Sequence, residues 1–436
     1  MEKTRIKIGL ISLGCPKNLA DLEALCSTMQ NIHITPVKQA KIVLLNTCGF
    51  LKKARAEVYE NINKLKNKKV VLLGCLAGKL TKEIFKKYPQ VRGVVSSAHY
   101  LNINSVLKYI NKNVRIFAVS KEPAMFENPA GKMLLSSAGY AYIKIAEGCN
   151  NKCAYCLIPS LKGQYRSRDM DDILAEAKYL INLGIKELIL VAQDCGCYGV
   201  DLYKEKKLHE LLKKLDKIKG KFWIRILYIY PETIDEKLLK TIASSKKILR
   251  YLDVPLQHGD PNVLKKMNRP ADTKKTLEKI NLIKKTLPGV TLRTSLIVGF
   301  PGESTKAFER LKSFVEKINF DHVGVFEYSR EKGTPSYSLK PQISGLIKRK
   351  RRKEVMLLQQ KISFANNKKL IGKKFEALIE NYNPDKKIYI GRIGRFAPEI
   401  DGLVYVKSKK KLNINEFVKI KITKVSPYDL QGDILQ

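Results

Sequence analysis

The sequence predicts an α/β protein in three parts: an N-terminal parallel α/β domain, a central partial (β/α)6 barrel and a small C-terminal β-barrel. Two stretches of apolar strand segments alternate with amphipathic helical segments, a pattern typical of parallel sheets. The C-terminal end instead consists of short strand segments broken by turn residues. A chain of 436 residues fits two or three domains. The predicted divisions are 1–131, 132–345, a basic linker helix at 346–369, and 370–436.

The N-terminal domain contains four predicted strands separated by helical segments such as 51–66. Each strand is a continuous apolar run, as expected where helices cover both faces of a parallel sheet. A looser segment at 121–133, which contains Pro and Gly, is predicted to be a linker. The predicted strands are 7–14, 41–47, 69–74 and 91–97.

The central domain contains six predicted β/α units, two fewer than a closed eight-fold barrel. A partial barrel of this kind places its reactive face at the carboxyl ends of the strands. A basic helix is predicted at 347–367, and the strands KFEALIEN, KIYIGRIG, GLVYVKS and FVKIKITKV follow it. The six barrel strands are predicted at 140–146, 187–193, 223–229, 251–256, 291–299 and 322–328.

Three cysteines, Cys149, Cys153 and Cys156, form a C-x3-C-x2-C loop directly after the first barrel strand. Three thiolates on one tight loop can hold three irons of a [4Fe-4S] cluster and leave the fourth iron open. The amine and carboxylate of S-adenosylmethionine (SAM) suit that open position. A zinc site would need a fourth ligand nearby, which the sequence does not offer. The alternative is that these cysteines, the barrel trio, are small buried residues.

A second set, the N-terminal trio, consists of Cys15, Cys48 and Cys75, and each follows a predicted strand. The carboxyl ends of parallel strands share one edge of a sheet, so the three thiols are expected to meet there. This predicts a second three-cysteine iron-sulfur site. The alternative is packing, because cysteine is often buried as a small apolar residue.

For the other three cysteines, a role in chemistry is not the favoured interpretation. Cys195 and Cys197 follow the second barrel strand, and a C-x-C pair can bind metal, but incidental thiols are the favoured interpretation. Cys26 lies in the first helical stretch and is predicted to be a core residue.

The net charge of +41 raises the question of a nucleic-acid partner. The charge is spread almost evenly over the three parts and is mostly lysine, whereas directed phosphate recognition favours arginine. Compositional bias is therefore favoured, although an RNA-rich partner such as the ribosome is compatible. No apolar run approaches the roughly 20 residues of a membrane span, and the N-terminus has no cleavage site. A cytoplasmic location without membrane contact, where thiols stay reduced, is expected.

The loop GCNNKCAYC (148–156) resembles the radical SAM signature, with Tyr155 as the aromatic residue before the last cysteine. Together, the two trios, the barrel and the terminal β-barrel resemble the methylthiotransferase family over essentially the whole chain. ISLGCPKNLADLE (11–23), GCNNKCAYCLIPSLKGQYRSR (148–168), YLDVPLQH (251–258) and APEIDGLVYV (397–406) are similar to the branch that modifies ribosomal protein uS12. Pro16 and Ser160 differ from the transfer-RNA branch, and Asp194-Cys195-Gly196-Cys197 departs from the threonines more usual after the Asp.

The resemblance implies that each trio ligates one [4Fe-4S] cluster and that the C-terminal barrel is a TRAM domain. It implies that one SAM donates a methyl group and a second is cleaved to a 5′-deoxyadenosyl radical. A methylthio group is then added to the β-carbon of an aspartate of uS12, with electrons from a flavodoxin or ferredoxin. No catalytic residue beyond the cluster ligands is predicted. The predicted cofactor neighbours are Tyr155, Gln193, Arg225, Gly299 and Gly302.

Two alternatives stay open at this point. A transfer-RNA methylthiotransferase acting on a modified adenosine beside the anticodon is favoured by the charge, because uS12 is itself basic and should be repelled. A non-catalytic RNA-binding iron-sulfur protein would use the terminal barrel and the basic run at 348–353, although such a run is usually a solvated helix face.

Overall fold

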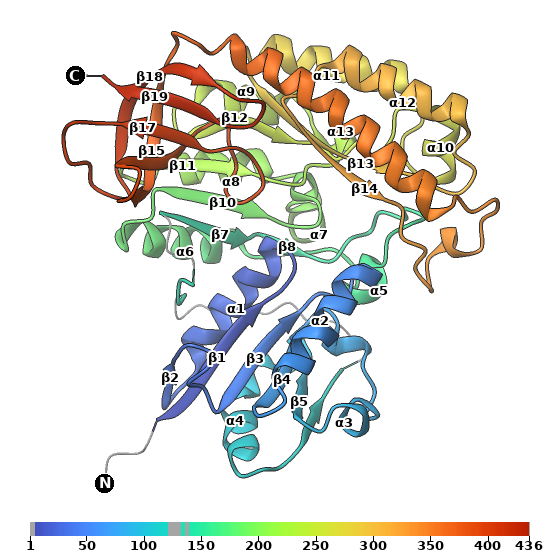
Figure 1. Ribbon diagram of the computed structural model, residues 1–436, viewed down its shortest axis with the longest axis vertical. Helices are drawn as coiled ribbons and strands as arrows, with labels where there is room; N and C mark the ends of the chain where they lie inside the picture. Colours follow the sequence, from blue (N-terminus) through green and yellow to red (C-terminus); the bar gives the residue numbers. More distant parts are fainter. Residues whose placement is uncertain (1–4, 121–131, 136–138, 436) are drawn as a thin grey trace.

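The structure is a computed structural model that describes residues 5–120, 132–135 and 139–435. Figure 1 shows the N-terminal domain below the open barrel, with the C-terminal β-barrel beside the barrel strands. The predicted linker at 121–133 lies almost wholly outside the described residues. No helix in the described part of the chain is long and apolar enough to cross a membrane.

The N-terminal domain is a six-stranded parallel sheet in the order β2-β1-β3-β4-β5-β6. Apolar clusters cover both faces, one around Leu44 and Ile103 and the other around Leu45 and Val58. The four predicted strands are present, and two further strands of three residues each lie at the edges. The strands are β1 (Ile6–Ser12), β2 (Ile32–Ile34), β3 (Ile42–Thr47), β4 (Lys69–Gly74), β5 (Val91–Val95) and β6 (Ile116–Ala118). The helices are α1 (Pro16–Thr28), α2 (Lys52–Lys64), α3 (Ile84–Lys87) and α4 (Ile103–Asn111).

The central domain is a six-stranded parallel sheet in the order β14-β13-β12-β11-β10-β7, which confirms the predicted partial barrel. Helices cover its outer face over the largest apolar cluster among the described residues. The strands are β7 (Tyr140–Lys144), β10 (Glu187–Val191), β11 (Trp223–Ile226), β12 (Ile248–Asp253), β13 (Thr291–Val298) and β14 (His322–Glu327), with the short pair β8 (Ala146–Glu147) and β9 (Arg166–Ser167). The helices are α5 (Ile158–Lys162), α6 (Met170–Asn182), α7 (Val200–Tyr203), α8 (Leu208–Asp216), α9 (Glu236–Ser244), α10 (Pro261–Lys266), α11 (Thr273–Thr286) and α12 (Thr305–Ile318).

The C-terminal part is a closed five-stranded barrel in the order β15-β16-β17-β19-β18, as predicted except for the unforeseen last strand. The basic helix α13 (Gly345–Lys368) packs against β14 and α12 along the edge of the open barrel (Figure 1). Val355 is its fully buried contact with the apolar cluster at that edge. The strands are β15 (Lys374–Asn383), β16 (Ile388–Ile393), β17 (Val404–Lys407), β18 (Phe417–Val425) and β19 (Leu430–Ile434).

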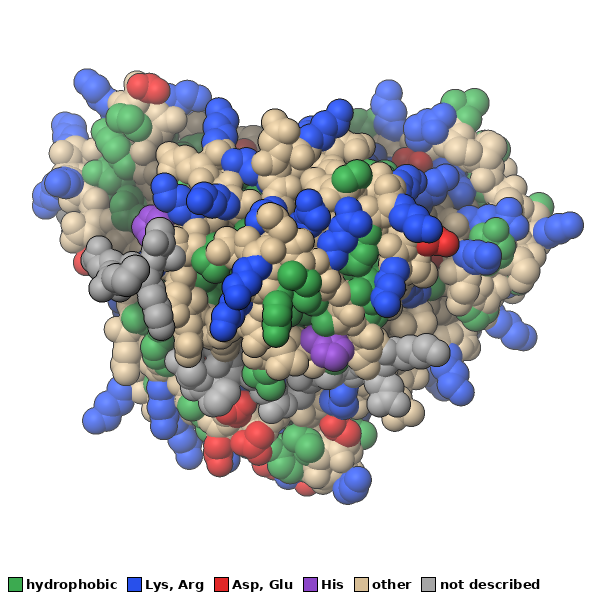
Figure 2. All heavy atoms as spheres, turned by 90° about the horizontal axis from the view of Figure 1, so that it is seen from below, with side chains coloured by type: hydrophobic (Ala, Val, Ile, Leu, Met, Phe, Trp, Pro, Cys, Tyr) green, Lys and Arg blue, Asp and Glu red, His purple; other side chains and the backbone are tan. Residues whose placement is uncertain are grey.

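The inner face of the open barrel is covered from both ends of the chain. Ala20 of helix α1 and Ala397 of the C-terminal part pack in one apolar cluster with the inward side chains Tyr142, Ile189 and Tyr251. The N-terminal domain and the C-terminal barrel therefore both border the interior that the six strands leave open. Figure 2 shows that lysine and arginine side chains are spread over the face seen from below rather than gathered in one patch.

Candidate active site

The barrel trio lies on a loop, 148–156, that other segments hold in place. Gly148 has φ +83°, and a Cβ there would overlap the carbonyl oxygen of Gln164, so only glycine fits this turn. The N–H of Cys149 donates to the carbonyl of Gly163 (3.2 Å), and that of Ala154 donates to the carbonyl of Met267 (2.9 Å). The three cysteines are thus presented on a fixed loop beside the carboxyl ends of the barrel strands.

Each sulfur of the barrel trio accepts a hydrogen bond from a nitrogen atom. The Arg269 guanidinium donates to Cys153 Sγ (3.8 Å), the N–H of Ile158 donates to Cys156 Sγ (3.4 Å), and the N–H of Asn151 donates to Cys149. Burial raises the pKa of Cys156 to about 12 and also raises that of Cys149, so neither of these two thiols ionises readily by itself. Donors aimed at sulfur are the contacts that stabilise thiolate ligands and set the potential of an iron-sulfur cluster.

The N-terminal trio lies at the carboxyl ends of β1, β3 and β4, which are neighbours in the sheet. Gly14 has φ +103°, and a Cβ there would lie 2.9 Å from the Cβ of Cys48, so glycine allows these two turns to approach. Cys75 Sγ donates to Asn18 Oδ1 (3.3 Å). Mainly because of burial, and despite the opposing charge of Lys162, the pKa of Cys75 is raised to about 12. Cys15 and Cys48 make smaller contributions in the same direction, so the three thiols are close enough to interact.

Each trio supplies the type and number of ligands that an iron-sulfur cluster takes from a protein. In residues 5–120, 132–135 and 139–435, no three His, Cys, Asp or Glu side chains converge closely enough to hold one metal ion. A cubane spreads its thiolates over several irons, so its ligands stand farther apart than those of one zinc ion. The barrel trio, with hydrogen-bond donors at its sulfurs, and the N-terminal trio, at three neighbouring strand ends, each offer the three thiols that such a cluster takes.

Lys17 connects the two trios. It is the second residue of α1, directly after the turn of Cys15, and its Nζ donates to the carbonyl of Ala192 (3.3 Å) beyond β10. The ammonium also lies 4.5 Å from the centre of the Tyr228 ring, just beyond β11. It lowers the pKa of both Cys48 and Cys156, against the larger opposing effect of burial. A single side chain is thus close to both trios, so they border the same space.

Four buried charged side chains join the N-terminal domain to the start of the barrel. We call Asp21, Lys144, Glu147 and Lys162 the buried charge quartet; Glu147 contacts Lys144 (2.8 Å) and Lys162 (3.0 Å). Asp21 of α1 completes the quartet by pairing with both lysines. Although burial alone would raise it, the two ammonium groups hold the pKa of Glu147 well below its usual value. Because Glu147 directly precedes the 148–156 loop, the quartet ties that loop to the helix that follows Cys15.

A second ionic contact closes the other side of the site. Both carboxylate oxygens of Glu331, beyond β14, reach helix α2: one accepts from the N–H of Lys52 (2.7 Å) and the other from Arg55 (2.6 Å). Arg55 also donates to the carbonyl of Gly49 (3.1 Å), next to Cys48. The N-terminal trio is therefore held against the barrel from two sides. One contact is with β7, the first barrel strand, and the other is with the segment that follows β14, the last barrel strand.

Four of the five predicted cofactor neighbours lie in loops at the carboxyl ends of barrel strands. Tyr155 contacts Cys153, and burial raises its pKa well above the usual value. Gln193 donates to Glu147 (3.3 Å), while its buried Oε1 has no hydrogen-bond partner among the described residues. Gly299 and Gly302 have φ +71° and +77°, and the N–H of Gly299 donates to Glu303 (2.5 Å).

Arg225, the fifth, has a different environment from the one expected. Its side chain is fully buried, and its guanidinium pairs with Glu187 (2.6 Å) and donates to the carbonyls of Gly394 (3.2 Å) and Phe396 (2.9 Å). Arg392 of β16 binds the other oxygen of Glu187 (2.6 Å). These contacts assign the guanidinium to the interface with the C-terminal barrel, so we replace the interpretation of Arg225 as a cofactor neighbour with that of a domain anchor.

Replacing Arg225 by Met should lower the free energy of unfolding by about 3 kcal/mol, because it leaves part of a buried ionic contact uncompensated. Urea unfolding of the purified protein measures this. The control Arg250→Met removes an exposed arginine of β12 and should change stability by no more than about 0.5 kcal/mol. Unchanged stability of Arg225→Met, together with weakened SAM binding, would restore the original interpretation.

The loop with Cys195 and Cys197 is organised by Asp194. The Asp194 carboxylate accepts from the N–H of Tyr230 (3.1 Å) and from Asn151 (3.3 Å) of the 148–156 loop. Cys195 is fully buried in the core, whereas Cys197 donates to Asp194 (3.2 Å). Cys26 is fully buried, as predicted.

Sequence reasoning missed Lys17, Arg269 and the buried charge quartet. The only local signal for the quartet is a lysine and a glutamate in the otherwise apolar segment 140–147. Lys17 and Arg269 carry no such signal, because their roles arise from contacts with residues far away in the chain.

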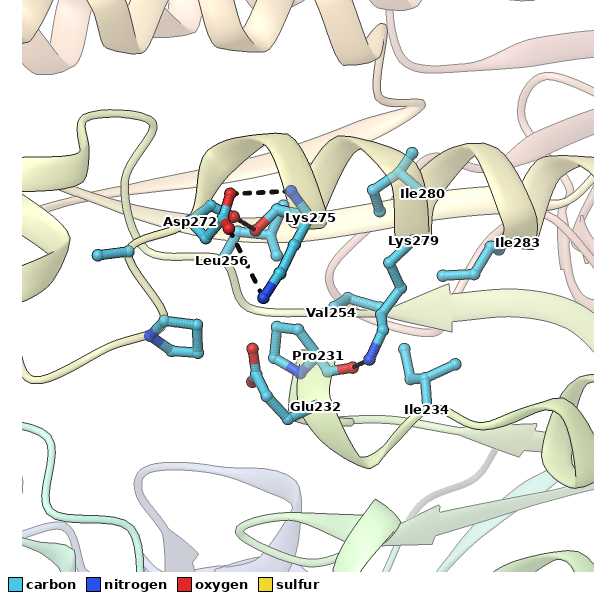
Figure 3. A pocket seen from close by; sticks show the side chains of 13 residues that line it. Pro231, Glu232, Ile234, Val254, Leu256, Asp272, Lys275, Lys279, Ile280 and Ile283 are labelled. Atoms are coloured by element: carbon cyan, nitrogen blue, oxygen red, sulfur yellow. Dashed lines mark hydrogen bonds and ion pairs between the residues drawn. The ribbon is translucent and has the colours of Figure 1, made fainter.

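A cavity of about 270 Å³ lies apart from the thiols, between the loops after β11 and β12 and helix α11. Figure 3 shows Lys279 pointing to the carbonyl of Pro231, to which it donates (2.9 Å). Burial raises the pKa of Glu232 at the cavity wall. A smaller space that shares Pro231, Glu232 and Leu256 with this cavity extends to Arg269. None of the three thiols of the barrel trio is among the lining residues of either space, and Arg269, which donates to Cys153, lines the smaller one.

Family models cover each of the three parts. Residues 143–315 match the Radical SAM superfamily, residues 7–96 match Uncharacterized protein family UPF0004, and residues 371–435 match the TRAM domain. With the open barrel and its three-cysteine loop, the first match defines a radical SAM enzyme. It indicates SAM and an iron-sulfur cluster as cofactors.

Curated relatives identify the family within this class. The chain is 42% identical over 448 residues to "Ribosomal protein uS12 methylthiotransferase RimO" of Acetivibrio thermocellus, covering 98% of each chain. It is 43% identical over 436 residues to the protein of the same name of Thermoanaerobacter sp., covering 98% of this chain and 99% of the relative. The chain belongs to the uS12 methylthiotransferase RimO family and is a radical SAM methylthiotransferase.

Solved structures share the fold at low identity. The radical SAM methyltransferase TsrM of Kitasatospora setae, with tryptophan substrate and a SAM analogue, superposes with a TM-score of 0.56 at 12% identity over 74% of this chain and 72% of that one. Its form with cobalamin and a [4Fe-4S] cluster gives the same TM-score at 13% identity, over 76% and 77%. At this identity the likeness concerns the fold alone.

Proposed function

We propose that this protein adds a methylthio group to the β-carbon of an aspartate of ribosomal protein uS12. The relatives that are 42–43% identical over almost the whole chain carry that substrate in their names. The observation that carries the proposal is that two sets of three cysteines border one space next to Lys17. A chemistry that joins a radical step to sulfur insertion needs two such sites within reach of one substrate.

In this proposal each trio holds a [4Fe-4S] cluster, giving two clusters per chain. When bound, these clusters and two SAM molecules per turnover supply a methylated sulfur and a carbon-centred oxidant. The protein supplies thiol ligands, hydrogen-bond donors at the sulfurs of the barrel trio, and the buried charge quartet, which joins helix α1 to the start of the 148–156 loop. Tyr155, Gln193, Gly299 and Gly302 are proposed to line the SAM site, because they lie in the loops next to the barrel trio and Gln193 has an unused buried acceptor.

The same proposal includes the partners and the domains. A flavodoxin or ferredoxin is the proposed electron donor, and the TRAM domain is a proposed RNA contact on the ribosome. Because the proposed substrate is a ribosomal protein, we propose that this protein is located in the cytoplasm. The domain boundaries proposed are 1–131, 132–345, 346–369 and 370–436.

The substrate is tested with the reconstituted enzyme, SAM and a reductant, incubated separately with uS12 and with hypomodified transfer RNA. The expected result is a mass increase of one methylthio group on a uS12 aspartate and unmodified RNA. Methylthio-adenosine in the RNA with unmodified uS12 would overturn the proposal in favour of the transfer-RNA alternative. Absence of 5′-deoxyadenosine from fully loaded, reduced protein would instead favour the non-catalytic alternative.

A further inference from the structure

Lys17 is an ammonium group inside the proposed site that no carboxylate of the described residues neutralises. It forms no ion pair there, and its one hydrogen bond is to the carbonyl of Ala192. An ammonium has three donors, and one side of this one faces the Tyr228 ring. The half-buried Lys17 therefore retains donor capacity toward the space between the trios.

Three other cations near this space are already paired with carboxylates. Lys144 and Lys162 are held by Asp21 and Glu147 in the buried charge quartet. Arg293, next to Tyr228, pairs with Asp253 (3.2 Å) and Asp401 (3.6 Å).

Arg269 faces the barrel trio from the other side. It donates to Cys153 and to the carbonyl of Pro255, and it lies over the Tyr230 ring (3.9 Å). Of the cations considered around the space, Lys17 is therefore the one left available for an incoming anion.

We propose that Lys17 binds the side-chain carboxylate of the substrate aspartate and so selects a carboxylate-bearing side chain. This inference rests on the proposed function. The β-carbon of aspartate is bonded directly to its carboxylate carbon, so an ion pair at the carboxylate also positions the β-carbon. A charge-assisted hydrogen bond from Lys17 would hold that carbon between the trios, which is where hydrogen removal and sulfur addition must both occur.

The geometry of α1 explains why this residue is suited to the role. Helix α1 begins directly after Cys15 with Pro16 at its first position, which fixes the backbone entry into the helix. Asp21, one turn further on, belongs to the buried charge quartet and anchors the helix to the barrel. Lys17 therefore projects from a helix end that is fixed on both sides.

The test measures binding without turnover. Cluster-loaded protein, without SAM or reductant, is titrated with two peptides of the uS12 loop that differ only in Asp or Asn at the modified position. Wild-type protein should bind the Asp peptide about 10- to 100-fold more tightly, the range expected for a hydrogen bond to a charged group. Lys17→Met should lose this preference, and Lys17→Arg should keep most of it. The control Lys108→Met, an exposed lysine of α4, should bind like the wild type.

The outcomes separate this inference from the proposed function. Equal binding of the two peptides by the wild type, or an unchanged preference in Lys17→Met with full iron content, would overturn the role of Lys17. If Lys17→Met loses iron, the wild type and Lys17→Arg are compared instead. A preference for the Asp peptide in both supports the role of Lys17, and equal binding of the two peptides by either overturns it. Failure of the proposed function looks different, because the wild type would then leave both the Asp peptide and intact uS12 unmodified while modifying transfer RNA.

Discussion

Replacing Cys153 by Ala is expected to abolish cleavage of SAM. Cys153 is the central member of the barrel trio and the one whose sulfur accepts from the buried Arg269 guanidinium. Without it, the 148–156 loop offers two thiols, too few to hold three irons. The yield of 5′-deoxyadenosine from reduced protein should fall to that of a protein-free control, and iron content should fall by about half. Liquid chromatography of the products and iron and sulfide counts measure the two effects.

The matched control is Cys197→Ala, which removes a thiol from the neighbouring loop. Cys197 donates to Asp194 and is not part of either trio, so this variant should keep its iron and still cleave SAM. If Cys153→Ala still made 5′-deoxyadenosine at the wild-type rate, the barrel trio would be structural. If both variants lost activity equally, the 194–197 loop would belong to the site.

The positions of the two trios could be predicted because parallel sheets place the carboxyl ends of their strands at one edge. Cys15, Cys48 and Cys75 each follow an apolar strand, and those strands are neighbours in the sheet. The strand segments themselves were recognisable because they are buried on both faces. β2, β6 and β19 were not, because they are short and lack a continuous buried run.

The docking of the domains could not be predicted in the same way. Arg225 ends a strand segment like a site residue, yet the C-terminal barrel supplies the carbonyls of Gly394 and Phe396 that bind it. Lys17 likewise acquires its role only when helix α1 packs against the first barrel strand. Local sequence patterns report which residues are buried along one element, whereas these contacts join segments about 170 residues apart.

Replacing Cys15, Cys48 and Cys75 together by Ala is expected to stop methylthio transfer while SAM cleavage continues. The three thiols belong to a separate sheet, and the barrel trio keeps its loop, its donors and Arg269 when they are removed. About half of the iron should be lost. The protein should still form 5′-deoxyadenosine, but the uS12 aspartate should gain no methylthio group in mass spectrometry.

Two comparisons make this result specific. Cys26→Ala removes a buried thiol of helix α1, which follows Cys15. This variant should keep all iron and full transfer, because Cys26 is fully buried in the apolar core and belongs to neither trio. A Cys149/Cys153/Cys156→Ala variant should lose the other half of the iron together with SAM cleavage. If the N-terminal triple variant kept all its iron, the N-terminal trio would be a packing feature, and the sulfur inserted into the substrate would need another carrier. Loss of both activities would instead mean that the N-terminal trio supports the barrel trio, because the buried charge quartet transmits the disturbance from α1 to the 148–156 loop.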